Sequence, residues 1–204
     1  MGVTVCWVRH AETAWTISGQ HTGVTELALT PHGEQQARGL SARLRCWSFN
    51  QVLVSPRWRA RQTCELAGFG ATIPVDADLA EWDYGEYEGR RSVDIRRERP
   101  GWDIWQQGCP GGESPAQVGA RIDRLIARLL TMEGHVALFS HGQLGAAFAA
   151  RWLGLALREG QHFPLGIASV SLLGTDPHHR QRRTLNLWNH APEPQPDWAG
   201  SPRG

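Results

Sequence analysis

Three short apolar segments, at residues 3–8, 51–54 and 136–139, constrain the fold of this chain more than any other feature. They are rich in residues that favour strands, and stretches with helical patterning lie between and after them. Strands that alternate with helices are typical of a largely parallel sheet covered on both faces. The sequence therefore predicts an α/β fold, a three-layer sandwich with a mostly parallel central sheet flanked by helices.

Capping residues and apolar periodicity predict four helices. Thr30 and Pro31 open one that runs to about Cys46, and others are expected over residues 57–66 and about 144–153. Ser114 begins a capping box, and apolar residues recur behind it at helical spacing until Gly134 ends the helix. Further strands are expected at residues 73–75, 168–173 and 183–188. We expect one domain, residues 1–190, followed by a disordered tail rich in proline and glycine at residues 191–204.

Cationic side chains follow all three apolar segments. Arg9 and His10 come after the first, an arginine-rich segment at residues 57–61 after the second, and His141 after the third. The carboxyl ends of parallel strands meet at one edge of a sheet, where such folds bind ligands. An arginine fork holds two phosphate oxygens, a neutral imidazole can attack phosphorus, and the amides of the helix after His141 can face the same anion. Alone, each residue is equally compatible with an ion pair, a loop or a helix cap.

The residues alone leave two choices open. Arg57, Arg59 and Arg61 alternate, so at least one of them must point into solvent. Phosphoryl transfer through histidine also needs an acid for the leaving group. The candidates share one acidic, aromatic loop and are Glu81, Asp83, Glu86 and Glu88. Glu81 lies nearest the preceding apolar segment, where desolvation would raise its pKa.

Composition excludes several functions. All 21 basic residues are arginine, so the chain has no lysine for a Schiff base, a phosphate-binding loop or a kinase site. The net charge of +1 argues against a nucleic-acid partner. The four cysteines lack metal-site spacing, so we expect reduced, buried thiols, no metal and no cofactor. No signal or membrane segment is evident, which favours a cytoplasmic location without a membrane partner and leaves a homodimer open.

Taken together, four motifs in order resemble the histidine phosphatase superfamily, the phosphoglycerate mutase-like proteins. They are Arg9-His10-x-Glu12-Thr13, Ser55-Pro56-x-x-Arg59-Ala60-x-x-Thr63, Glu81 with Gly85 and Glu88-Gly89, and Ser140-His141-Gly142. The resemblance implies that His10 is the phosphorylated nucleophile and that Glu81 is the proton donor. It also implies that Arg9, Arg59 and His141 hold the phosphoryl oxygens, and it alone selects Arg59.

The same resemblance implies a substrate-binding set. Thr22, Gly23 and Tyr84 fall where the family contacts substrate, and Gly142 adjoins the second histidine. Thr16 stands at a position that is commonly asparagine in the mutases, which leaves the substrate unspecified.

The spacing of the motifs favours hydrolysis over transfer. Glu81 and His141 are only 60 positions apart, whereas the similar mutases carry a longer insertion there. The segment from Glu81 to Ser114 is similar to a branch with fungal sedoheptulose-bisphosphatase-like enzymes and actinobacterial acid phosphatases. We therefore expect a phosphomonoesterase for small sugar phosphates or related phosphate esters, with a small phosphorylated metabolite as its partner.

Two other functions remain open. One is phosphoglycerate mutase-type phosphoryl transfer, and the other is a phospho-ligand binding protein without turnover. The basic cluster is a separate question, because it could meet a second phosphate or form a solvated helix face. Its members are Arg90, Arg91, Arg96, Arg97 and Arg99.

Overall fold

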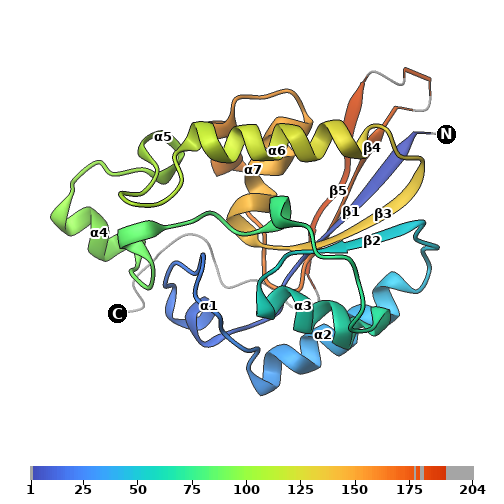
Figure 1. Cartoon of the computed structure of the whole chain (residues 1–204), viewed down its shortest axis with the longest axis horizontal. Coiled ribbons are helices and arrows are strands. Elements are labelled where there is room, and N and C mark those ends of the chain that lie inside the picture. Colours follow the sequence, from blue (N-terminus) through green and yellow to red (C-terminus); the bar gives the residue numbers. More distant parts are fainter. Residues whose placement is uncertain (1, 177, 180–181, 192–204) are drawn as a thin grey trace.

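The computed structural model describes residues 2–176, 178–179 and 182–191, and its central element is a five-stranded sheet (Figure 1). The strands are β1 (Val3–Arg9), β2 (Gln51–Val54), β3 (Gly134–Ser140), β4 (Val170–Thr175) and β5 (Arg183–His190), in the order β2-β3-β1-β4-β5. β3 is parallel to both β1 and β2, whereas β4 is antiparallel to both β1 and β5. Only β4 therefore runs against the other described strands, and the predicted mostly parallel sheet is confirmed.

Helices cover both faces of this sheet (Figure 1). They are α2 (Pro31–Leu44) and α3 (Trp58–Cys64) on one face, and α6 (Pro115–Leu129) and α7 (Gly142–Trp152) on the other. The side chains of β1 alternate between two cores, since Val5 and Trp7 pack with α6 and α7 while Cys6 and Val8 pack with α2 and α3. The three-layer sandwich is confirmed.

Several short helices were not predicted. They are α1 (Ala14–Ser18), α5 (Ile104–Gln107), η1 (Glu65–Phe69), η2 (Ala77–Leu79), η3 (Gly85–Tyr87) and η4 (Leu157–His162), whereas α4 (Ser92–Glu98) falls on the basic cluster, for which a helix face was one interpretation. Each is too short for apolar periodicity to reveal it. In Figure 1, α1, α4 and α5 lie on the left, beyond the end of the sheet where β1 finishes. α1, α4 and α5 therefore lie next to the edge at which the strand-end cations gather.

The structure corrects several predicted boundaries. Residues 73–75 form only a bridge between Val54 and Val75, because Pro74 has no N–H to donate to a strand ladder. The helix that follows Ser114 ends at Leu129, while Gly134, in the left-handed conformation at φ +79°, already opens β3. The first predicted helix ends at Leu44.

Other corrections concern the late strands and the cysteines. β4 begins at Val170 because Ala168 has a positive φ of 49°, which does not fit a strand. All four thiols are free, but Cys46 is exposed because it lies in the turn after α2. Apart from Ala191, the predicted tail lies outside the described residues.

Gly33 and Gly39, both in α2, test how closely this helix approaches the segment after β1. A Cβ atom on Gly33 would lie 2.2 Å from the carbonyl oxygen of Glu12, whereas one on Gly39 would meet nothing within 4 Å. We expect Gly39→Ala to raise the free energy of unfolding by about 0.5–1 kcal/mol, because alanine favours helices. Gly33→Ala should lower it by about 1–3 kcal/mol, because backbone must move. Urea unfolding followed by circular dichroism measures both, and equal stabilisation by the two variants would contradict the close approach.

Candidate active site

Strand register brings the residues that follow β1, β2 and β3 to one place. Arg9 pairs with Ser140 across β1 and β3, and the N–H of His10 donates to the carbonyl of Ser140 at 2.9 Å. The N–H of Ser55 donates to the carbonyl of Phe139 at 2.9 Å. The three strand ends thus meet at one edge, as the sequence predicts.

His10 is held with one ring nitrogen directed at the backbone. Its Nδ1 lies 2.8 Å from the carbonyl oxygen of Ala11, which can only accept, so Nδ1 carries the proton. Nε2 therefore keeps its lone pair. The side chain is only 4% exposed, yet it lines a cavity of about 330 Å³. His10 thus has an unprotonated nitrogen in a pocket large enough for a small ligand.

His141 lies beside His10, with the two ring centroids 5.3 Å apart. Its Nε2 is 2.7 Å from the hydroxyl oxygen of Ser55, which also accepts the N–H of Arg57 at 3.3 Å. The Ser55 hydroxyl can donate its proton to Nε2 while it accepts the N–H of Arg57, and in that arrangement the ring proton of His141 is on Nδ1. Nδ1 of His141 is buried without a partner in the described structure.

Both imidazoles are neutral near pH 7. Burial lowers the pKa of His10 well below its ordinary value, and the nearby guanidiniums of Arg59 and Arg9 lower it further. Burial likewise lowers the pKa of His141, again with Arg59 as the next contributor. Neutral rings are what a nucleophile and an uncharged donor require.

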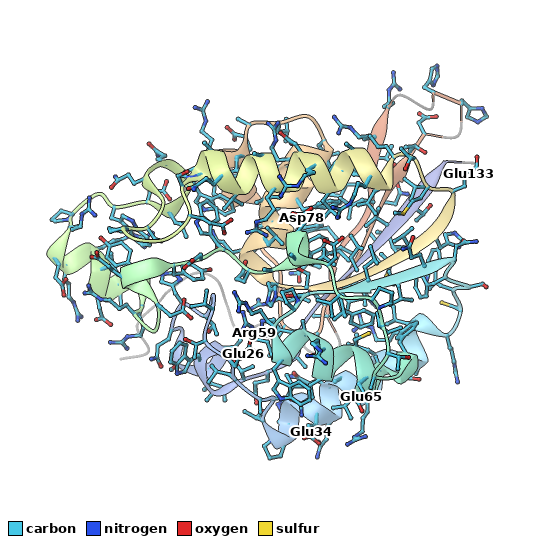
Figure 2. The ribbon with its side chains drawn as sticks, in the orientation of Figure 1. Glu26, Glu34, Arg59, Glu65, Asp78 and Glu133 are labelled. Carbon is cyan, nitrogen blue, oxygen red and sulfur yellow. The ribbon has the colours of Figure 1, made fainter. Side chains whose placement is uncertain are left out.

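Arg59 is fully buried and organises the loop before α2 (Figure 2). Its guanidinium donates to the carbonyls of Thr25 at 3.1 Å, Thr22 at 2.8 Å and Gly23 at 3.2 Å. Glu88 holds the same loop by accepting the N–H groups of Gly23 and Thr25 at 2.9 and 3.0 Å. Nε of Arg59 is buried and unpartnered in the described structure, so this cation retains a free donor.

The other arginines of the second motif point elsewhere, as their alternate spacing predicts. Arg57 faces the carboxylate of Glu26, with Nη1 3.5 Å from Oε1. Arg61 packs its guanidinium over the ring of Trp58, 5.8 Å from the centroid.

Arg9 is the second buried cation. Its Nη1 donates to the carbonyl of Leu165, while Nε is buried without a partner in the described part of the chain. A Cβ on Gly142 would lie 2.9 Å from this Nε, so glycine at that position gives the guanidinium its room.

The carboxylate of Glu81, in the loop after η2, lies against the first turn of α7. Its carboxylate accepts the N–H groups of Leu144 at 2.7 Å, Trp82 at 3.0 Å and Gln143 at 3.1 Å. Burial raises the pKa of this carboxyl above its ordinary value, although these N–H groups and Arg59 oppose the rise. The sequence predicts that the α7 amides face a bound anion, whereas in the structure the N–H groups of Gln143 and Leu144 donate to the Glu81 carboxylate.

The cavity brings together seven of the ten predicted site residues. Those that line it are Arg9, His10, Thr16, Thr22, Glu81, Tyr84 and Gly142. Arg59, His141 and Gly23 lie outside this lining, the first two fully buried behind it. Further lining residues escaped the sequence analysis, among them Trp15, His21, Trp105, Gln143, Phe163 and Leu165. Most of these lie in loops or on short helices, where periodicity gives no signal.

Comparison with known proteins identifies the family. A model of the histidine phosphatase superfamily (branch 1) matches residues 5–190. The chain belongs to this superfamily. It is 42% identical over 197 residues to an acid phosphatase of Mycobacterium tuberculosis, covering 95% of each protein. It is 38% identical over 185 residues to sedoheptulose 1,7-bisphosphatase of Saccharomyces cerevisiae, covering 74% of this chain and 68% of that one.

A solved structure supports the same assignment. The product of a Mycobacterium tuberculosis open reading frame superposes with a TM-score of 0.86 at 38% identity, over 92% of this chain and 97% of that one. Two predictions are therefore confirmed: the phosphoglycerate mutase-like fold, and that the protein is an enzyme of the histidine phosphatase type.

The described residues contain neither a membrane-spanning helix nor a metal-binding cluster. None of the described helices combines the length and apolar character needed to cross a membrane. Histidine, cysteine and acidic side chains in the described ranges form no group of three or more that could hold a metal ion.

The two buried histidines should share one tautomer. We expect ¹⁵N NMR of the protein to show Nδ1–H and unprotonated Nε2 for both His10 and His141, and both rings to stay neutral well below pH 6.5 because burial and the arginines oppose protonation. Ser55→Ala should leave His10 unchanged and allow His141 to populate the other tautomer. Titration of either ring near pH 6.5 in the wild type would contradict this geometry.

Proposed function

We propose that this protein is a phosphomonoesterase that hydrolyses small sugar phosphates or related phosphate esters through a phosphohistidine on His10. The observation that carries the proposal is the unprotonated Nε2 of His10, which its Nδ1 contact leaves available inside the cavity. Arg9 and Glu81 line the same cavity, so a nucleophile, a cation and an acid surround one ligand.

The first step forms the phosphohistidine. Nε2 of His10 attacks phosphorus, the bond from phosphorus to the ester oxygen breaks, and the protonated Glu81 carboxyl gives its proton to the departing alkoxide. Negative charge on the phosphoryl oxygens is stabilised by the free Nε donor of Arg9, which lines the cavity. We assign the same role to Nε of Arg59 and Nδ1–H of His141, which lie outside the lining and must move to reach the ligand.

The second step is hydrolysis. Water attacks phosphorus while the Glu81 carboxylate, now ionised, takes its proton, and the bond from phosphorus to Nε2 breaks. Inorganic phosphate leaves, and the enzyme regains a neutral histidine and a protonated acid. Burial lowers the pKa of His10 and raises the pKa of Glu81, so it favours the neutral form of both groups, which this cycle requires.

The names of the relatives support the choice of substrate class. The yeast relative is a sugar bisphosphatase and the mycobacterial one an acid phosphatase. The cavity of about 330 Å³ fits a small phosphorylated metabolite, and its aromatic and amide side chains suit a sugar better than a long apolar chain.

A covalent label tests the mechanism. Rapid quenching with a ³²P-labelled phosphate ester should give a label on His10 that survives alkali and is lost in acid, because a phosphorus–nitrogen bond is acid-labile. His10→Ala should abolish both label and turnover, while His178→Ala, at an exposed histidine, should retain both. Alcohol and inorganic phosphate should appear in equal amounts. A fully active His10→Ala protein would contradict the proposal. Transfer of the phosphoryl group to an acceptor ester without release of inorganic phosphate would indicate a mutase.

The pH profile tests the acid. The value of kcat/KM should fall as pH rises, because the buried Glu81 loses its proton, and should persist on the acidic side, because the lowered pKa of His10 keeps it neutral. Glu81→Gln should abolish the fall in kcat/KM at high pH that this carboxyl causes. It should also slow the hydrolysis of an alkyl phosphate by about 10²–10⁴-fold. A smaller loss is expected with p-nitrophenyl phosphate, whose leaving group needs less protonation. Equal losses on both esters would remove Glu81 from this role.

A further inference from the structure

A second cavity adjoins the one that contains His10. It has a volume of about 450 Å³ and shares four lining side chains with the first cavity, namely His21, Trp105, Gln143 and Gln161. A ligand whose phosphate lies against His10 can therefore extend across these side chains into the second cavity. The lining of the second cavity also includes Ser92 and Arg96 of α4.

Arg96 differs from the other arginines of the basic cluster. Those are engaged: Arg90 pairs with Glu98, Arg91 and Arg97 pair with Asp94, and Arg99 donates to the hydroxyl of Tyr87. Arg96 makes a single long hydrogen bond, from Nε to the carbonyl of Trp102 at 3.3 Å, and has no ion pair among the described residues. Its charge is therefore available to a ligand.

The groups around Arg96 are suited to an anion. The hydroxyl of Ser92 and the side-chain amides of Gln143 and Gln161 provide neutral donors in the same cavity. His21 is 3.1 Å from the Ser92 hydroxyl, and burial lowers its pKa to about 4, so this ring adds no charge near pH 7.

One carboxylate also lines this cavity. Asp103 caps α5, where it accepts the N–H of Trp105 at 3.1 Å and Nε2 of Gln106 at 3.2 Å. These donors partly neutralise Asp103, and it forms no ion pair with Arg96 in the described structure. Arg96 therefore supplies the positive charge of the described lining of the second cavity, and Asp103 is a second charged group there without an ion pair.

We propose that Arg96, with Ser92, Gln143 and Gln161, binds a second phosphate group of the substrate. A guanidinium fork can hold two oxygens of one phosphate, and the neutral donors can satisfy the others. The enzyme then prefers sugar bisphosphates to monophosphates of the same sugar. This inference rests on the proposed function, because it places the reacting phosphate against His10.

Competition against p-nitrophenyl phosphate tests the second subsite without requiring turnover of the sugar. For the wild type, fructose 1,6-bisphosphate should inhibit at a concentration about tenfold lower than fructose 6-phosphate, as expected for one additional charge-assisted contact. Arg96→Gln should remove this difference and leave hydrolysis of p-nitrophenyl phosphate unchanged. Arg96→Lys should retain part of it.

Arg97→Gln is the matched control, since Arg97 is on the same helix but pairs with Asp94 and does not line the cavity. It should keep the wild-type difference. Equal inhibition of the wild type by the two sugars, or an equal effect of Arg96→Gln on both, would overturn the inference. Absence of p-nitrophenyl phosphate hydrolysis by the wild type would instead refute the proposed function.

Discussion

The parallel pairing of β1 with β3 is the interaction on which the rest of the site depends. Its register sets Arg9 opposite Ser140, so that His10 and His141 emerge beside each other at the same edge. A shift of one residue would direct every side chain of the shifted strand to the opposite face and separate the two rings. The register is specified by burial on both faces, since Val5 and Trp7 pack into one core and Cys6 and Val8 into the other.

Burial at this edge gives the site its chemical character. Two arginines and two histidines lie together, and the resulting repulsion and desolvation keep the imidazoles neutral. The same desolvation favours the protonated form of Glu81. In water a carboxyl is ionised near neutral pH, so burial moves this pair towards the combination of a neutral imidazole and a protonated carboxyl.

The walls of the site are built differently from its floor. The floor comes from the end of β1 and from α7, whereas the walls come from loops and from short helices such as α1, α5 and η4. Rigid elements suit groups that must be placed accurately for the reaction at phosphorus. Loops and short helices suit the groups that distinguish one phosphate ester from another, and Arg96 on α4 belongs to this second class.

The sequence alone determined the layered fold, because apolar strand segments alternate with helical ones along the chain. It also predicted five principal site residues, with Arg9, His10 and His141 placed by the strand ends and Arg59 chosen, like the role of Glu81, by resemblance to the family motifs. It could not predict which donors Glu81 would bind, nor that Arg59 would hold the loop at Thr22, since these contacts join segments distant in the chain. It also could not tell which arginine of the basic cluster is without an ion pair and lines a cavity. Only the tertiary structure separated Arg96 from its neighbours, because pairing between side chains depends on where α4 lies against the cavity and not on local sequence.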